Sequence, residues 1–369
     1  MRRFILPNPK KSARPCALAL CLALCACTGM PGGNGGAVVI EKQGSFAVGG
    51  KTIQREGVYD NRKFAGWGTP VETGQTYRGD HAIAEFQIPE NARPLPLVFV
   101  HGYGQSSRCW ATTPDGRPDF RTLMLRKNYA TYLVDLPGRG NAGRTTAEQT
   151  VSPKADEQLW FDIWRLGEWP NFNPGVQFPQ DAESLDQFFR QMTPDLSAHS
   201  TEADAEAIAA LFRRIGRGVL VTHSAGGLPG WLAATKSENV RGVVAYEPGT
   251  YVFPEGELPA PMPSLTGALS GVAVPAEDFA KLTKIPIVLY FGDYIPETVS
   301  EKLGDENWRV RLQLGRKFVE AVNRHGGNAT LVELPEIGVR GNTHFLMSDL
   351  NNAEIADLLG EWLARENLE

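Results

Sequence analysis

The chain has 369 residues, of which 42% are hydrophobic and 21% are charged, so it can bury a large core and carries no composition typical of disorder. Its formal net charge is -5 and it has no basic face, which argues against nucleic acid as a partner. This length fits one α/β domain with an insertion as well as it fits two domains.

The first 26 residues differ from the rest of the chain. Basic side chains precede an apolar stretch, 16–26, that is too short to cross a bilayer as a helix but long enough for a signal-peptide core. Small residues followed by Cys27 resemble the cleavage box of bacterial lipoproteins. We therefore expect 1–26 to be a lipoprotein-type signal peptide and Cys27 to carry a lipid anchor to the membrane. The alternatives are ordinary cleavage nearby and a retained membrane anchor.

The remaining chain is then an exported protein, either periplasmic or anchored to the outer membrane. Cys109 is the only cysteine in the expected folded domain, so no intrachain disulfide framework can form. Residues 31–36 read Pro-Gly-Gly-Asn-Gly-Gly, a composition typical of a flexible tether. We expect tether and lead-in over 27–50 and a folded domain over 51–369.

The predicted sheet begins with short antiparallel strands and continues with parallel ones. Short strands are expected at 37–40 and 45–48, and alternating apolar residues indicate another at 81–89. From residue 95 the pattern changes to continuous apolar runs separated by helical stretches, which is typical of buried parallel strands. These features predict an α/β fold with a mostly parallel, doubly wound sheet. The runs are 95–100, 129–134, 218–222, 240–246, 285–291 and 329–334.

A long segment at about 141–216 contains no buried-strand run. Apolar residues recur in it at helical spacing, which predicts a helical cap inserted into the sheet domain. Its aromatic side chains could wall an apolar substrate pocket, although we expect most of them to form the core of the cap. They are Trp160, Phe161, Trp164, Trp169, Phe172 and Phe178.

Ser224 is the candidate nucleophile. The run 218–222 leads into His223-Ser224-Ala225-Gly226-Gly227 and then an amphipathic stretch, which predicts a strand, a sharp turn and a helix. Such a turn presents a serine hydroxyl above the carboxyl edge of the sheet. The usual signature is Gly-x-Ser-x-Gly, and Thr222 occupies its first glycine position. The alternative is a Ser/Gly turn without chemistry.

A serine hydroxyl is a weak nucleophile unless an imidazole takes its proton and a carboxylate orients that imidazole. His344 is the candidate base, because it lies in a loop after the last apolar run and could reach the carboxyl edge of the sheet. His223 should point away from its neighbour Ser224, and His325 lies at a polar helix end.

Two acids could orient His344. Asp293 follows the run 285–291, and Glu247 follows the run 240–246. Both would lie at the same edge of the sheet, so these patterns alone do not separate them.

Two backbone N–H groups are needed to stabilise an oxyanion in such a site. One would come from Ala225, directly after the candidate nucleophile, and the other from Tyr103 or its neighbour in the loop His101-Gly102-Tyr103-Gly104. The glycines beside Tyr103 allow the backbone to turn its donors toward the site.

Taken together, these features resemble the α/β-hydrolase fold and, more narrowly, the family typified by the novel bacterial esterase. Over about 95–365 the resemblance is carried by Trp110-Ala111-Thr112-Thr113-Pro114-Asp115-Gly116-Arg117, Leu125-Arg126-Lys127, Asp135 to Gly140, Gln177-Phe178-Pro179, His223-Ser224, Glu247-Pro248-Gly249, Gly341-Asn342-Thr343-His344 and Asp349-Leu350-Asn351-Asn352.

The resemblance implies that the acid is the glutamate after the sixth strand, Glu247, with Asp293 as a supporting carboxylate. It also implies an ester substrate, no metal or other cofactor, and a homodimer. The family's type member has two adjacent cysteines in the oxyanion loop, where this chain has Tyr103 and Gly104.

We therefore expect a serine carboxylesterase in which Ser224, His344 and Glu247 form the triad and Tyr103 and Ala225 form the oxyanion hole. Alternatives of the same fold are a lactonase, a polyesterase, an amidase or an acyltransferase. From a different class, the chain could be a non-catalytic lipoprotein that binds an apolar ligand under its cap.

Overall fold

The computed structural model describes residues 36–369 except 61, 63–67, 69, 72–73, 150, 197–200 and 266. The expected signal peptide, Cys27 and nearly all of the expected tether lie outside the described residues. Within the described part of the chain, no helix has the length and apolar character needed to span a membrane.

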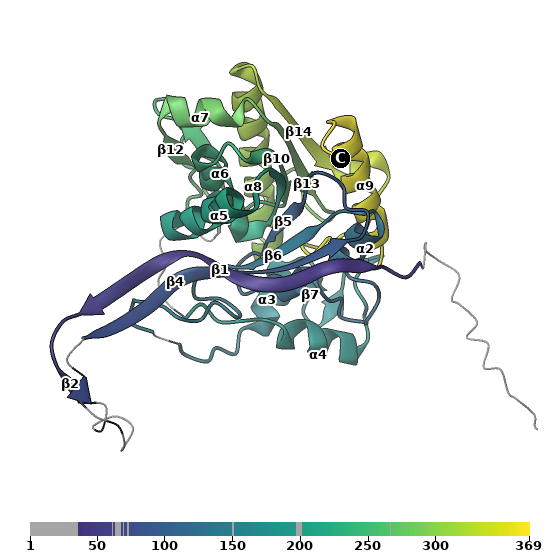
Figure 1. Ribbon diagram of the computed structural model, residues 1–369. Helices are drawn as coiled ribbons and strands as arrows, with labels where there is room; N and C mark the ends of the chain where they lie inside the picture. Colours follow the sequence, from purple (N-terminus) through teal and green to yellow (C-terminus); the bar gives the residue numbers. More distant parts are fainter. Residues whose placement is uncertain are drawn as a thin grey trace, which may run out of the picture. The chain divides into compact units, whose positions relative to one another are not determined.

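The centre of the domain is an eight-stranded sheet with the order β1-β4-β6-β5-β9-β10-β13-β14 (Figure 1). The strands from β6 to β14 in this order are mutually parallel. All six predicted apolar runs are strands of this parallel part, so the predicted α/β fold is confirmed. Their bounds are β5 Leu97–Val100, β6 Thr131–Asp135, β9 Gly218–His223, β10 Val240–Tyr246, β13 Pro286–Phe291 and β14 Asn328–Glu333.

The lead-in strands differ from the prediction. One strand, β1 (Ile40–Arg55), replaces the short strands expected at 37–40 and 45–48, and the expected boundary at residue 50 falls inside it. It pairs antiparallel with β4 (Gln75–Pro89), which in turn pairs antiparallel with β6. Most of β1 is exposed, so it lacks the apolar pattern that marks a buried strand.

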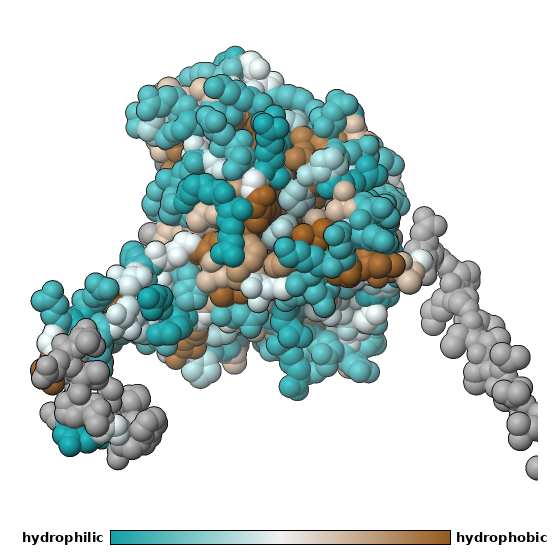
Figure 2. Space-filling view, in the orientation of Figure 1, coloured by the Kyte–Doolittle hydropathy of each residue, from teal (hydrophilic) through white to brown (hydrophobic). Residues whose placement is uncertain are grey.

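The outer ends of β1 and β4 extend beyond the helices toward a small two-stranded sheet (Figure 1). In the view of Figure 2 this arm is largely hydrophilic. Its two-stranded sheet consists of β2 (Tyr59–Asp60) and β3 (Pro70–Val71).

Helices cover both faces of the parallel strands, because alternate strand residues face opposite sides. Val98 and Val100 belong to one hydrophobic cluster, and their neighbours Leu97 and Phe99 belong to the other. This is the predicted doubly wound arrangement. The first cluster includes α5 (Thr201–Ile215), α6 (Gly227–Lys236), α7 (Ala276–Leu282) and α8 (Leu303–Arg324), and the second includes α2 (Phe120–Arg126) and α9 (Asn352–Arg365).

The cap is shorter than the predicted range of 141–216. Helix α5 packs directly on the sheet, since Ile208, Leu211 and Phe212 are buried in the same cluster as Val100. Helical periodicity predicts an apolar face but does not reveal what that face contacts, so the sequence pattern alone does not separate a cap helix from one that packs on the sheet. The rest of the segment forms α3 (Glu157–Ile163), β7 (Gly167–Glu168), β8 (Asn171–Phe172) and α4 (Ala182–Arg190).

The aromatic side chains of this segment mostly form a core that continues into the sheet domain. Phe161, Trp164 and Phe178 are buried, and they share one cluster with Phe99 of β5. The cap and the sheet are therefore packed as one hydrophobic unit rather than as separate layers.

Small elements complete the connections between strands and helices. The short 3₁₀ helices are η1 (Ser107–Trp110), η2 (Ser224–Gly226) and η3 (Leu334–Ile337), and the short strands are β11 (Val252–Pro254) and β12 (Val272–Val274). The loop that follows η3 carries His344 and ends at α9.

Candidate active site

Ser224 lies at the predicted junction of strand, turn and helix. It directly follows β9 and begins η2, which leads into α6. Its φ angle is 54°, in the left-handed region that non-glycine residues rarely adopt. Such strain is typical of functional positions, where it is maintained by the surrounding structure.

The threonine at the first glycine position of the signature is accommodated by a glycine elsewhere. A Cβ added to Gly230 of α6 would lie 2.6 Å from the Cγ2 atom of Thr222. Because Gly230 has no side chain, the helix can pack against Thr222 without displacing it. The departure from the usual signature therefore does not prevent the sharp turn at Ser224.

Sheet register brings Glu247 beside the turn of Ser224. Tyr246 of β10 pairs in parallel register with His223 of β9, so Glu247 and Ser224 directly follow paired residues on neighbouring strands. The N–H of Gly249 donates a hydrogen bond of 2.8 Å to the carbonyl oxygen of Ser224. The segment that carries the candidate acid is thus attached to the segment that carries the candidate nucleophile.

Glu247 and His344 are in direct contact in the interior. The Nδ1 atom of His344 lies 2.5 Å from Oε2 of Glu247, and the two side chains are 1% and 0% exposed. The N–H of Gly292 donates to the other carboxylate oxygen at 2.7 Å. The imidazole also packs on the indole of Trp308, with ring centroids 4.0 Å apart. These contacts fix the orientation of the imidazole.

Asp293 occupies a different position from the one an orienting acid requires. Its carboxylate accepts hydrogen bonds from the N–H groups of Gly341 and Tyr294, both at 2.8 Å. Asp293 therefore supports the loop that carries His344 and makes no direct contact with the imidazole.

Asp349 supports the same loop from its other end. Its buried carboxylate accepts hydrogen bonds from the N–H and hydroxyl groups of Thr343 and from the side-chain amide of Asn342. The residues directly before His344 are thus held in place by two carboxylates, those of Asp293 and Asp349.

The two groups that would exchange a proton are the hydroxyl of Ser224 and the Nε2 atom of His344. Within the described residues they form no hydrogen bond, either with each other or with another group. His223, the neighbour of Ser224, contacts His344 directly. Its Nε2 atom donates to the carbonyl oxygen of His344 at 2.9 Å, and the centroids of the two imidazole rings lie 4.4 Å apart. The nucleophile's neighbour and the candidate base are therefore packed together.

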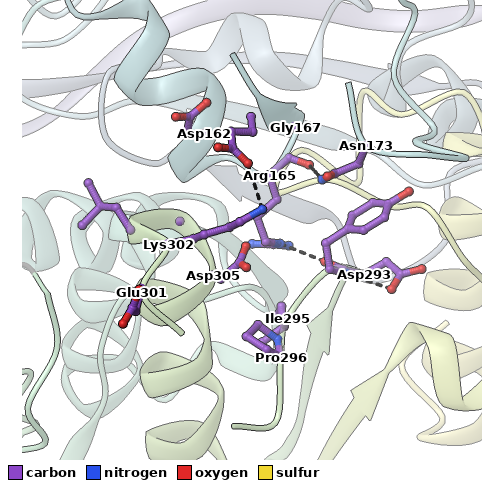
Figure 3. Close-up of a pocket in the computed structure, with 14 residues that line it drawn as sticks. Asp162, Arg165, Gly167, Asn173, Asp293, Ile295, Pro296, Glu301, Lys302 and Asp305 are labelled. Carbon is purple, nitrogen blue, oxygen red and sulfur yellow. Dashed lines mark hydrogen bonds and ion pairs between the residues drawn. The ribbon is translucent and has the colours of Figure 1, made fainter. Parts of the chain in front are cut away.

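Arg165 is a member of this cluster that the sequence patterns did not indicate. Its guanidinium is fully buried, pairs with Oε1 of Glu247 and donates through Nε to the carbonyl oxygen of Asp293 at 2.9 Å. It lies at the wall of a cavity of about 560 Å³ and points toward Asp293 (Figure 3). An arginine between Trp164 and Leu166, in an otherwise buried stretch, was the available signal for a buried ion pair.

The electrostatics of the cluster favour a neutral imidazole and an ionised carboxylate. Burial lowers the pKa of His344 to about 4, and the Glu247 carboxylate only partly opposes this effect. Burial also disfavours the charged form of Glu247, but the Arg165 guanidinium and His344 outweigh it and hold the pKa of Glu247 at about 2. Near neutral pH, His344 is therefore in the protonation state that can accept a proton.

The candidate oxyanion loop approaches Ser224 closely. A Cβ added to Gly102 would lie 2.7 Å from the Cβ atom of Ser224, so this approach requires a glycine. His101 fixes the loop, because its Nδ1 atom bonds the carbonyl oxygen of Gly102 and its Nε2 atom accepts from the N–H of Leu136. Burial lowers the pKa of His101 to about 4, which matches this neutral bonding pattern.

A cavity of about 440 Å³ lies beside the serine turn. Its lining includes Tyr103 and Ala225, the two candidate oxyanion donors, together with Gly249. None of the six cap aromatics lines it, although Trp160 packs against the ring of Tyr103 with centroids 5.1 Å apart. Trp160 thus packs against the candidate oxyanion loop, and the cap aromatics do not form the wall of this cavity.

Among the described residues, no group of three or more His, Cys, Asp or Glu side chains is arranged to hold a metal ion. The buried cysteine, Cys109, has a free thiol whose pKa burial raises well above its ordinary value, so it is unsuited to act as a thiolate.

Comparison with known proteins gives three findings. The model of a family described as the alpha/beta hydrolase family matches residues 97–367. A probable secreted lipase, phiG, from a fungal species (strain ATCC 74256) is 27% identical over 329 residues, which cover 79% of this chain and 88% of the lipase. The atomic resolution structure of a novel bacterial esterase has a TM-score of 0.72 and 28% identity, over 91% of this chain and 99% of that chain.

We predict that the His344 ring stays neutral as the pH falls from about 7 to about 5. Its pKa of about 4 lies below the ordinary value of 6.5, because burial disfavours the imidazolium. Nitrogen NMR of the ring follows this titration directly. Replacement of the carboxylate in Glu247→Gln should lower the pKa further, since that carboxylate favours the charged ring. A midpoint at or above 6.5 in the unmodified protein would contradict the prediction.

We predict that Arg165→Met destabilises the fold by about 3–5 kcal/mol, because it leaves the buried Glu247 carboxylate without its cation. Arg165→Lys should recover only part of this loss, since an ammonium cannot reproduce the planar guanidinium that bonds Glu247 and Asp293. Urea unfolding near pH 7 gives the free energies. Lys302→Met is the control, because its partner Glu168 is exposed and such pairs contribute about 0–1 kcal/mol. Equal effects of Arg165→Met and Lys302→Met would refute the assignment.

Proposed function

The chain belongs to the alpha/beta hydrolase family, and on that premise we propose that it is a serine carboxylesterase. In this proposal Ser224, His344 and Glu247 form the catalytic triad, and an acyl-enzyme is the intermediate. The observation that carries it is the buried contact of 2.5 Å between His344 and Glu247, at the end of the strand next to that of Ser224.

In the first half of the reaction the Oγ atom of Ser224 attacks the ester carbonyl carbon. His344 takes the hydroxyl proton at Nε2, which makes no hydrogen bond among the described residues, while Nδ1 remains bonded to Glu247. The N–H groups of Ala225 and Tyr103 stabilise the oxyanion. His344 then returns the proton to the departing alcohol oxygen as the ester C–O bond breaks.

In the second half a water molecule attacks the acyl-enzyme. His344 removes a proton from the water, the tetrahedral intermediate collapses, and the Oγ atom of Ser224 leaves with the proton that His344 returns. The acid product is released and the free enzyme is regenerated. The low pKa of Glu247 keeps this carboxylate ionised throughout, so it stabilises the imidazolium without taking the proton itself.

The test is a rapid-mixing experiment with an aryl acetate. We predict a burst of phenol equal to the enzyme concentration when deacylation is slower than acylation, and the loss of that burst in Ser224→Ala. Electrospray mass spectrometry of the quenched enzyme should show an added acetyl group. A Ser224→Ala variant with full turnover would overturn the proposal.

The two acids serve as a matched pair in the same experiment. Glu247→Gln should lower kcat by about 10⁴, as removal of the charged orienting carboxylate does in serine proteases. Asp293→Asn keeps a side chain of the same size and should lower kcat much less, because the Asp293 carboxylate bonds backbone N–H groups and not His344. The reverse ranking would assign the orienting role to Asp293.

We also propose that the protein is exported and attached to a membrane through a lipid on Cys27. The proposal rests on residues 1–27, which lie outside the described residues, and the fungal relative is itself described as secreted. Metabolic labelling with a fatty acid analogue should mark the full-length protein, and Cys27→Ser should abolish the label. A label that persists in Cys27→Ser would refute attachment at this residue.

A further inference from the structure

The cavity beside Ser224 is lined in part by an arginine that has no carboxylate partner among the described residues. Arg311 of α8 lines it together with Ala225 and Gly249. Within the described residues, Arg311 forms no ion pair. Burial lowers its pKa, and among its neighbours only the hydroxyl of Tyr251 acts in the opposite direction. A partly buried cation carries a desolvation cost, and no carboxylate among the described residues offsets it.

Two contacts hold the guanidinium in place. Its Nη1 atom donates to the carbonyl oxygen of Asn307 at 3.0 Å and also to the side-chain oxygen of Asn307. The guanidinium carbon lies 5.5 Å from the ring centroid of Trp308. Trp308 is itself fixed, because its Nε1–H donates to the carbonyl oxygen of Ile163 at 2.7 Å. The Nε and Nη2 donors of Arg311 form no hydrogen bond with another described residue.

Arg311 is also close to the reacting groups. Trp308 packs against His344 in a tilted arrangement with ring centroids 4.0 Å apart, so one indole contacts both the guanidinium and the candidate base. The cavity that Arg311 lines also contains both candidate oxyanion donors. A group bound to Arg311 would therefore belong to a molecule that lies beside Ser224.

The other charged residues of the cavity do not neutralise Arg311. Arg139 pairs with Asp195 at 2.7 Å. Burial raises the pKa of Asp204 to about 7, and the charges that act on it are those of Arg139 and Asp195. Arg139, Asp195 and Asp204 therefore interact with one another, and Arg311 is not among the charges that act on Asp204.

We propose that Arg311 binds a carboxylate of the substrate, so that the preferred ester carries a negative charge on its acyl or its alcohol part. This inference rests on the proposed esterase function. Two unused donors on one guanidinium match a carboxylate in bidentate geometry. Binding of the anion would compensate the partly buried charge of Arg311, for which the described residues supply no carboxylate.

The experiment compares esters that differ in one charge. Monomethyl glutarate against methyl pentanoate tests the acyl side, and 3-acetoxybenzoate against phenyl acetate tests the alcohol side. We expect kcat/KM to favour the charged member in at least one pair. Arg311→Met should lower that preference about 10- to 100-fold, the effect of losing hydrogen bonds to a charged group. Arg311→Lys should retain part of it, because a point charge remains without the fork geometry.

Arg316→Met is the matched control, since it removes the same charge from the same helix at an exposed ion pair with Glu333. It should leave the preference unchanged. The inference is overturned if no charged ester is preferred, or if Arg311→Met lowers kcat/KM equally for the charged and neutral members of a pair. Activity on the neutral ester also reports whether the variant is folded.

Failure of the esterase function gives a different result. If none of the four esters is hydrolysed, the carboxylate site is tested by calorimetry with glutarate and 3-hydroxybenzoate on Ser224→Ala. Binding that disappears in Ser224→Ala/Arg311→Met supports the site without the proposed reaction. Absence of binding, or binding that survives the second substitution, overturns the inference.

Discussion

The site depends on one buried carboxylate, that of Glu247, which contacts His344 on one side and Arg165 on the other. An ionised carboxylate without partners would be strongly unfavourable in this interior. Its two partners come from distant parts of the chain: Arg165 follows α3 in the cap, and His344 lies in the loop before α9. The contacts of a single side chain therefore join the cap, the sheet and the C-terminal loop. Movement of the segment that carries Arg165 would leave the carboxylate without its cation, so this part of the cap belongs to the site itself.

Burial explains which strands the sequence could predict. The six parallel strands are buried on both faces, so each one is a continuous apolar run with clear ends, and all were found within about two or three residues. Strand β1 is exposed over most of its length and carries no such signal. Helix α5 shows the opposite case, because its apolar face was recognised but its contact with the sheet was not. A periodic pattern shows that one face of a helix is buried. Only the tertiary structure shows which element that face contacts.

Some residues of the candidate site could be predicted from the sequence and others could not. The turn at Ser224 and the position of His344 follow from the order of motifs along an α/β chain. Motif order does not decide between Glu247 and Asp293 as the orienting acid, because both residues follow neighbouring parallel strands. In the structure Glu247 contacts His344, whereas the carboxylate of Asp293 bonds backbone N–H groups of the same loop region.

Arg165 and Arg311 could not be assigned from the sequence, because each role depends on contacts between separate elements, and both side chains also lie beside Trp308. Both guanidiniums lie near its ring, with their carbons 5.2 and 5.5 Å from the centroid. Arg165 has an internal counter-charge in Glu247, and its cation serves to keep that carboxylate ionised. Arg311 has no such partner and borders the cavity at the serine turn. The two guanidiniums beside this indole therefore differ in their partners. Arg165 completes an interior ion pair with Glu247, whereas Arg311 can pair with a ligand, as we propose.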